Sequence, residues 1–556
     1  MNMKQLMTKW ADNINEKNVL GEYPRPLMRR KSYVNLNGIW KYAIRETKGF
    51  PKKMDGDILV PFSPEAVLSG VNRQLKPEEY LWYKRRLPNE VKPEKGSRWI
   101  LHFGAVDQCA VVYINGKKQG KHVGGYLPFS YDITEALKEE KNLLTVKVRD
   151  YSETCYYSRG KQKLKNGGMF YTAQSGIWQT VWIEKVPECY IGHLKITPLY
   201  DQSSIMIQME EEHGIKDIDY EVTITARKMW PVKASGKTGK PCVIMIPHMR
   251  SWSPEDPFLY DLHVRMGEDS VESYFAMRKV EVKNDKEGIP RIFLNNEPYF
   301  EKGVLDQGYW PDGLYTPPCD EAMIYDIQKM KDLGFNMIRK HIKIEPQRWY
   351  YHCDRIGMLV WQDMPSGGGR YNLLTISAPL ITGIHLKDSH YRLFARTDPD
   401  GRDSFRQELE EMIRQLQNCP CIVLWVPFNE GWGQFDAKQI TRLVRKLDPT
   451  RLIDHASGWH DQGVSDVKSL HVYFKPYRFR PDKKGRAVVL SEFGGYNLPV
   501  AGHTWNEKNF GYKGYQTPEA LGEAVRKLYE TQIIPARKAG LAADVYTQLS
   551  DVEDEV

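Results

Sequence analysis

The sequence predicts a multidomain fold in which two all-β modules precede a (β/α)8 barrel. Three observations support this prediction. The first half of the chain contains short runs of alternating apolar and polar residues, separated by turn signals. After Lys283, strand-like runs alternate with helical ones, which is the pattern of a parallel α/β domain. At 556 residues, the chain is also too long for a single hydrophobic core.

Residues 1–187 have the pattern of a first all-β module. Asn115-Gly116 follows the apolar run 111–114 and is a strong signal for a two-residue hairpin turn. Residues 188–283 contain further short alternating runs, and a segment of about 95 residues has the size of an immunoglobulin-like sandwich. We therefore predict module boundaries near Pro187 and Lys283.

Residues 284–556 contain eight strand candidates, the number that a (β/α)8 barrel requires. The candidates are residues 300–305, 337–342, 358–361, 422–426, 452–455, 467–473, 487–490 and 544–546. Helices are predicted at residues 320–333, 346–356, 404–417, 437–447 and 518–539. Long loops are predicted at residues 305–318 and 366–402. The sequence stops ten residues after Tyr546, so we expect the eighth helix to be missing or very short, through truncation or an atypical closure.

Two of the buried strand candidates are followed by a glutamate. Glu430 follows the apolar run 421–426 in the segment Asn429-Glu430-Gly431-Trp432, and Glu492 follows the run 487–490. Active sites of such barrels lie at the carboxyl ends of the strands, so both side chains are expected at one end. Two carboxylates that flank a glycosidic bond are the groups that glycoside hydrolysis requires. The alternative is two solvated glutamates without a shared role.

These two motifs resemble those of glycoside hydrolase family 2, which includes β-galactosidases, β-glucuronidases and β-mannosidases. Asn429-Glu430 matches the family's acid/base motif, and Ser491-Glu492-Phe493-Gly494 matches its nucleophile motif. The resemblance implies a jelly-roll β-sandwich for residues 1–187, an immunoglobulin-like β-sandwich for 188–283 and a catalytic TIM barrel for 284–556. It implies a retaining, exo-acting β-glycosidase in which Glu492 is the nucleophile and Glu430 the acid/base. Burial and a nearby negative charge are expected to raise the pKa of Glu430.

The resemblance also implies residues that bind the substrate. Asn429 is expected to bind the sugar 2-hydroxyl, Arg339 to bond the nucleophile, and Tyr473 to lie near it. Each of these three could instead be a packing residue or a surface pair. Eight further side chains are expected to line the mouth of the site, although any of them could be structural: Asp306, His341, Trp361, Asp363, Trp432, Trp459, His471 and Trp505.

The expected specificity is β-galactosidase-like. β-Glucuronidase, β-mannosidase and α-L-arabinopyranosidase are alternatives within the family, and a catalytically inactive carbohydrate-binding protein is the alternative outside it. His471 stands where β-glucuronidases have Asn, and no Asn-x-Lys element follows the last strand. The missing element, which reads the glucuronide carboxylate in the family, argues against a glucuronide, although the early stop of the sequence could hide it. We expect no cofactor and no metal.

Composition suggests which partner classes to exclude. The net charge of +8 arises from 79 basic and 71 acidic side chains, and such mixed charge is weak support for nucleic-acid binding. The basic runs 161–165 and 478–486 are interpreted as solvated loops. No apolar segment reaches membrane-spanning length, and residues 1–18 lack the apolar stretch of a signal peptide. We therefore expect a carbohydrate substrate, no nucleic acid and no membrane; the compartment and a homo-oligomeric state stay open.

Overall fold

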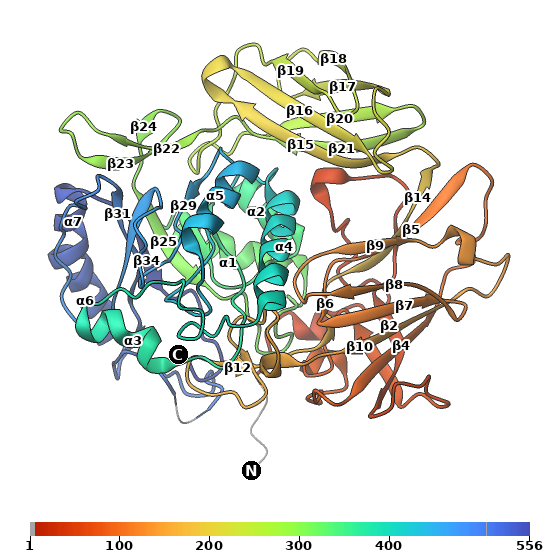
Figure 1. The fold of residues 1–556 in the computed structure, drawn as a ribbon, viewed down its shortest axis with the longest axis horizontal. Helices are drawn as coiled ribbons and strands as arrows, with labels where there is room; N and C mark the ends of the chain where they lie inside the picture. Colours follow the sequence, from red (N-terminus) through yellow and green to blue (C-terminus); the bar gives the residue numbers. More distant parts are fainter. Residues whose placement is uncertain (1–5, 507–508) are drawn as a thin grey trace.

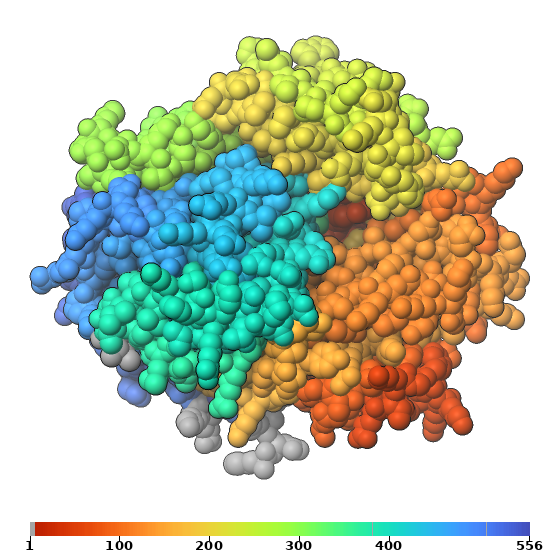
Figure 2. All heavy atoms as spheres, in the orientation of Figure 1, coloured from red at the N-terminus to blue at the C-terminus, as the bar shows by residue number. Residues whose placement is uncertain are grey.

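The computed structural model describes residues 6–506 and 509–556. It has the predicted multidomain fold, with two β-sandwich modules and a barrel (Figure 1). The first module, red to orange, lies beside the barrel, and the second module, yellow, lies across both. Figure 2 shows the three parts packed against one another on the visible face.

The first module is a β-sandwich of two antiparallel sheets. The larger sheet has the strand order β3-β2-β4-β10-β7-β8, and the smaller has the order β1-β14-β5-β9. The strand bounds are β1 (Val34–Asn35), β2 (Gly38–Arg45), β3 (Gly56–Val60), β4 (Tyr80–Arg86), β5 (Ser97–Phe103), β7 (Cys109–Ile114), β8 (Lys117–Val123), β9 (Phe129–Asp132), β10 (Leu143–Arg149) and β14 (Val181–Pro187). The predicted hairpin is confirmed: β7 and β8 pair around Asn115 and Gly116, whose φ angles of 52° and 82° suit the turn.

The second module has two antiparallel sheets, ordered β15-β16-β19 and β18-β17-β20-β21. The strand bounds are β15 (Ile191–Leu199), β16 (Ser204–Glu211), β17 (Asp219–Thr225), β18 (Val232–Lys237), β19 (Pro241–Met245), β20 (Tyr260–Met266) and β21 (Asp269–Phe275). Just beyond it, Arg278 donates hydrogen bonds to the carbonyls of Pro420 (2.9 Å) and Ile422 (2.7 Å). These bonds fix the start of the barrel strand that leads to Glu430.

The predicted boundaries can be compared with these strands. Pro187 is the last residue of β14, whereas Lys283 lies inside β22 (Val280–Asn284). That strand pairs with β23 (Pro290–Leu294), which in turn pairs with β24 (Glu297–Pro298). The division into three domains stays a prediction, and a small sheet bridges its second boundary.

The barrel sheet has eight parallel strands in the order β29-β28-β27-β26-β25-β34-β31-β30, with the first strand beside the last. The strand bounds are β25 (Glu301–Asp306), β26 (Met337–Lys340), β27 (Leu359–Asp363), β28 (Ile422–Val426), β29 (Leu452–Ile453), β30 (Val467–Val472), β31 (Ala487–Gly494) and β34 (Leu541–Thr547). β29 and β30 close the ring without a ladder between them. Across this gap the Ser469 hydroxyl donates to Asp454 at 2.9 Å.

The five predicted helices are all present on the barrel, and α3 is an additional one. The bounds are α1 (Asp320–Asp332), α2 (Gln347–Ile356), α3 (Leu373–Thr382), α4 (Pro399–Leu416), α5 (Ala437–Leu447), α6 (Pro518–Leu528) and α7 (Ile534–Ala539). α3 interrupts the predicted loop 366–402, and Pro379 lies inside this helix. A π-helical turn separates α6 from α7. In the described chain, β29 and β30 are not followed by a helix. The connection from β29 to β30 contains Gly458 and Gly463, whose φ angles of 83° and 70° suit glycine.

No helix among the described residues is both long enough and apolar enough to cross a membrane.

Candidate active site

Glu430 and Glu492 lie at the same end of the barrel, because both come at the carboxyl ends of parallel strands. Glu492 belongs to the last part of β31, and Glu430 lies four residues after the end of β28. The backbone of Glu430 has a left-handed φ of 50°, which is unfavourable for a residue other than glycine. Its amide holds this conformation by donating to the carbonyl of Ser457 at 2.9 Å.

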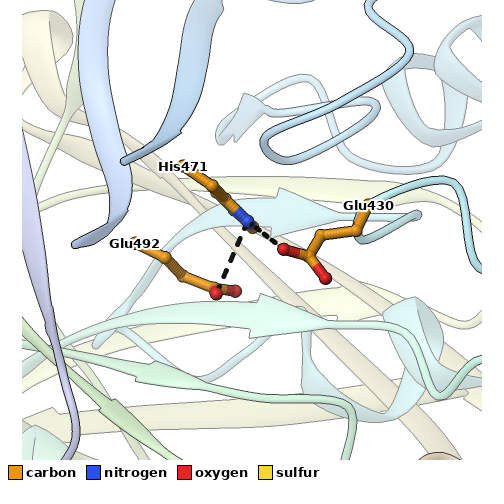
Figure 3. Close-up of side chains that lie close together, drawn as sticks. All are labelled: Glu430, His471 and Glu492. Atoms are coloured by element: carbon orange, nitrogen blue, oxygen red, sulfur yellow. Dashed lines mark hydrogen bonds and ion pairs between the residues drawn. The ribbon is translucent and has the colours of Figure 1, made fainter. Parts of the chain in front are cut away.

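One imidazole joins the two carboxylates (Figure 3). His471 Nδ1 lies 2.7 Å from Oε1 of Glu430 and 3.4 Å from Oε2 of Glu492. The three side chains offer oxygen and nitrogen atoms that all lie within 4.8 Å of one another. The imidazole reaches this place because β30 pairs with β31, so that His471 is the register partner of Glu492. On its other side, Nε2 of His471 lies 3.1 Å from the Ser457 hydroxyl.

Glu492 is held by two hydrogen-bond donors. Arg339 on β26 donates to Oε1 at 3.0 Å, and the hydroxyl of Tyr473 donates to Oε2. Arg339 has no exposed surface, so its charge acts in a poorly screened environment. Donors of this kind favour an ionised carboxylate.

Arg339 also connects Glu492 to three other predicted residues. Its guanidinium binds both oxygens of Asp363, at 3.0 and 2.9 Å, and donates to the amide oxygen of Asn429 at 2.8 Å. Nδ1 of His341 lies 2.8 Å from Oδ2 of the same Asp363. Burial and the positive charge of Lys161 hold the pKa of His341 well below its usual value, so this imidazole is neutral at pH 7.

The pKa of Glu430 differs from the sequence-based expectation. Burial raises it and is the largest single effect, but the hydrogen bond and positive charge of His471 act against burial, and together with Trp432 and Lys161 they bring the pKa below the ordinary value. A hydrogen bond from Trp432 Nε1 to Oε2 (3.1 Å) and the charge of Lys161 lower it further. The expected rise is therefore wrong for the free protein, because the expectation left out the imidazole between the two glutamates.

Aromatic rings surround the carboxylates. The indole of Trp459 lies 6.1 Å from the His471 ring, and Trp432 makes edge contacts with Tyr371 (5.0 Å) and Phe170 (5.9 Å). Tyr371 and Phe170 were not predicted, and neither was Tyr512, whose ring stacks on Tyr473 with centroids 3.8 Å apart. All three come from loops, where no periodic pattern reveals a direction. Aromatic side chains around a polar centre are suited to stacking on sugar rings.

Three predicted residues do not lie at the mouth. Trp361 points into the barrel like Asp363, but it lies two residues further from the carboxyl end of β27. It has no exposed surface, and its indole donates to Glu301 at 2.7 Å. Asp306 pairs with Lys340 at 2.5 Å, and Lys340 points away from the barrel axis because it follows the inward-pointing Arg339.

Trp505 is the third of these residues. It lines a small cavity with residues of the first module, among them Glu65, Gln74 and Thr172. In the described part of the chain, no hydrogen bond joins Trp505 to Glu430 or Glu492.

The carboxylate–imidazole–carboxylate group also has ligand types that bind metal ions. Its members are the residues to which the resemblance assigns catalysis. The expectation that no metal or cofactor is needed stays a prediction, which activity in the presence of a chelator tests.

Comparisons with known proteins agree with this architecture. The family model for the sugar binding domain of glycosyl hydrolases family 2 matches residues 70–187, and the model for the TIM barrel domain of that family matches residues 319–492. A β-galactosidase of Thermoanaerobacter pseudethanolicus is 25% identical over 76% of this chain and 55% of its own length. A putative β-glucuronidase of Formosa agariphila is 23% identical over 87% of this chain and 59% of its own length. This chain thus spans little more than half of these two relatives.

Other relatives have a similar length. A β-glucuronidase of Streptococcus agalactiae is 24% identical over 87% of this chain and 86% of its own length. A solved β-glucuronidase of an uncultured Clostridium has the same fold, with a TM-score of 0.72 over 95% of this chain and 93% of that chain at 20% identity. Together, the two matched domain models and the barrel with its paired glutamates establish that the chain belongs to glycoside hydrolase family 2.

Proposed function

We propose that this protein is a retaining, exo-acting β-glycoside hydrolase that removes terminal sugars from oligo- or polysaccharides by double displacement. The observation that carries the proposal is the spacing of the two glutamates, since one oxygen of Glu430 and one of Glu492 lie within 4.8 Å of each other. Retaining enzymes hold their carboxyl groups about 5–5.5 Å apart, whereas inverting enzymes need about 6.5–9.5 Å to admit a water molecule. The short spacing supports retention.

Glu492 is the nucleophile in this proposal. Its two donors, Arg339 and Tyr473, favour the ionised form that attacks the anomeric carbon. Glu430 protonates the departing oxygen and, after the glycosyl-enzyme has formed, takes a proton from the attacking water. The first step expels the leaving group with its proton, and the second returns both carboxyl groups to their starting state.

Glu430 must carry a proton when the leaving group departs, although His471 lowers its pKa in the free protein. A sugar that enters between Glu430 and His471 separates them. The lowering effect of His471 is then lost, so burial raises the pKa of Glu430 against Trp432 and Lys161 alone. Substrate binding itself therefore produces the general acid.

Asn429 is the proposed contact to the sugar 2-hydroxyl. Its amide oxygen accepts from Arg339, which fixes the side chain with its NH₂ group free to donate to a ligand. A hydrogen bond at this hydroxyl strengthens in the transition state. The sugar itself stays open: relatives named β-galactosidase and β-glucuronidase occur at almost equal identity, 25% and 24%. A β-galactoside and a β-glucuronide are therefore tested side by side.

The test is a set of 4-nitrophenyl glycosides: β-D-galactoside, β-D-glucuronide, β-D-mannoside and α-L-arabinopyranoside. We expect turnover of at least one sugar and retention of its anomeric configuration in the first product seen by NMR. The Glu492→Ala variant is the matched control and is expected to be inactive. A catalytically inactive binding protein gives no turnover with any glycoside, and an inverted first product refutes double displacement.

A further inference from the structure

The first module reaches the active site through one basic loop. The amides of Arg159 and Gly160 both donate to the carbonyl of Ser366, at 2.8 and 3.0 Å, and Ser366 comes three residues after Asp363. Gly160 fits closely against the barrel, since a Cβ atom added there would come within 3.0 Å of the Ile342 carbonyl. The next residue, Lys161, therefore starts at the carboxyl ends of β26 and β27, beside His341.

The basic side chains of this loop differ in their partners. Arg159 donates to the carbonyls of Gly368 and Gly369, and the ammonium of Lys163 lies 3.5 Å from the centre of the Phe170 ring. Lys161 is half-buried, yet its ammonium has no hydrogen bond or ion pair within residues 6–506 and 509–556. Its charge nevertheless acts on both His341 and Glu430, in agreement with the place of the loop beside His341.

An unpaired cation at this place is unfavourable for the protein alone. Partial burial removes hydration from the ammonium, and no carboxylate of the described chain lies close enough to form an ion pair with it. Its charge also makes Glu430 a weaker base and so hinders protonation of the proposed acid. A negative charge on the bound ligand would remove both disadvantages.

We propose that Lys161 binds an anionic group of the substrate, a carboxylate or a sulfate ester, so that the enzyme acts on acidic sugars. This inference rests on the proposed glycosidase function. It differs from the expectation that residues 161–165 form a solvated loop, because Gly160 packs against the barrel and Lys161 follows it directly. Lys161 is then a specificity-determining residue that the first module contributes to the barrel.

Binding tests the inference without turnover. Calorimetric titration of the wild-type protein compares D-glucuronate, D-galacturonate and D-galactose 6-sulfate with D-glucose and D-galactose. We expect at least one acidic sugar to bind about 10- to 100-fold more tightly than its neutral partner, as for a hydrogen bond to a charged group. Lys161→Ala should abolish this preference, whereas Lys165→Ala, in the same loop but exposed, should keep it. Binding of the uronates identifies a carboxylate ligand, and binding of the 6-sulfate identifies a sulfate ester.

The inference is overturned if Lys161→Ala binds acidic sugars as tightly as the wild type, or if the wild type prefers the neutral partner in each pair. Turnover then separates this failure from that of the proposed function. If glycosides are hydrolysed and the uronide-to-galactoside ratio of kcat/KM is the same in Lys161→Ala, the hydrolase stands and the anion site falls. If no glycoside is hydrolysed but the Lys161-dependent preference persists, the anion site stands and the hydrolase falls.

Discussion

His471 Nδ1 lies 2.7 Å from Oε1 of Glu430, and this contact determines the charge state of the proposed general acid in the free enzyme. The imidazole lowers the pKa of Glu430 by hydrogen bonding and by its positive charge, although burial acts in the opposite direction. The contact between His471 and Glu430 therefore influences the pH at which Glu430 loses its proton in the free protein.

The His471→Asn variant tests this relationship. It removes the imidazole, so burial is less strongly opposed and the pKa of Glu430 should rise. The basic limb of the kcat/KM profile, which reports loss of the acid's proton in the free enzyme, should move to higher pH. The exposed His390→Asn serves as the control and should leave the profile in place. A basic limb that stays or moves to lower pH contradicts the assignment of Glu430 as the acid.

Arg339 has a structural role that can be measured apart from catalysis. In Arg339→Ala the carboxylates of Asp363 and Glu492 lose their buried partner, which should destabilise the fold by about 3–5 kcal/mol and abolish turnover. Arg339→Lys should restore little, because one ammonium cannot bind both oxygens of Asp363 and also reach Asn429.

The control for this prediction is Arg414→Ala. Arg414 pairs with Glu210 at 2.6 Å, and both side chains are more than half exposed. Such a pair contributes about 0–1 kcal/mol. Urea unfolding of the three variants gives the comparison. Equal unfolding free energies for Arg339→Ala and Arg414→Ala would show that the Arg339 network does not stabilise the fold.

The sequence was sufficient to predict the barrel strands and the positions of the two glutamates. Barrel strands are buried on both faces, so β28 and β31 appear as continuous apolar runs whose ends are easily seen. Depth along a strand is harder to predict. Trp361 and Asp363 point to the same side, yet only Asp363 reaches the site, and the sequence gives no measure of how deep each lies.

Contacts between distant segments could not be predicted. Lys161 and Phe170 enter the site from another module, and Tyr512 comes from a loop after the last catalytic strand. Loops have no hydrophobic periodicity, so nothing in their residues tells which way they fold. The insertion of His471 between the glutamates was missed because it depends on the register of β30 against β31.

Glu301 links pH to stability. It is buried deep in the barrel, and burial raises its pKa from 4.5 to about 7 although Trp361 donates to it. The folded protein therefore binds this proton more tightly than the unfolded chain. Proton binding by Glu301 increases the free energy of unfolding by an amount on the order of 3 kcal/mol. This contribution is fully present below pH 4.5 and is lost as pH rises through about 7.

The variant Glu301→Gln keeps an acceptor for Trp361 but has no proton to lose. Its melting temperature relative to the wild type should increase as pH rises from 5 to 8. The exposed Glu410→Gln is the control, for which this difference should stay constant with pH. A constant difference for Glu301→Gln as well would mean that Glu301 is not the source of the pH dependence.

The two proposed catalytic roles predict different failures and different azide products. In Glu430→Ala the nucleophile remains, so an aryl group that leaves without protonation can still be displaced by Glu492, and the glycosyl-enzyme should accumulate for lack of a base. Azide needs no deprotonation and should restore turnover, releasing a β-glycosyl azide because two inversions retain configuration. In Glu492→Ala no glycosyl-enzyme forms, and azide can replace the nucleophile only from the opposite face, which gives an α-glycosyl azide.

The measurement is azide rescue of both variants on a 2,4-dinitrophenyl β-glycoside, with NMR of the products. An α-azide from Glu430→Ala together with a β-azide from Glu492→Ala would mean that the roles are reversed.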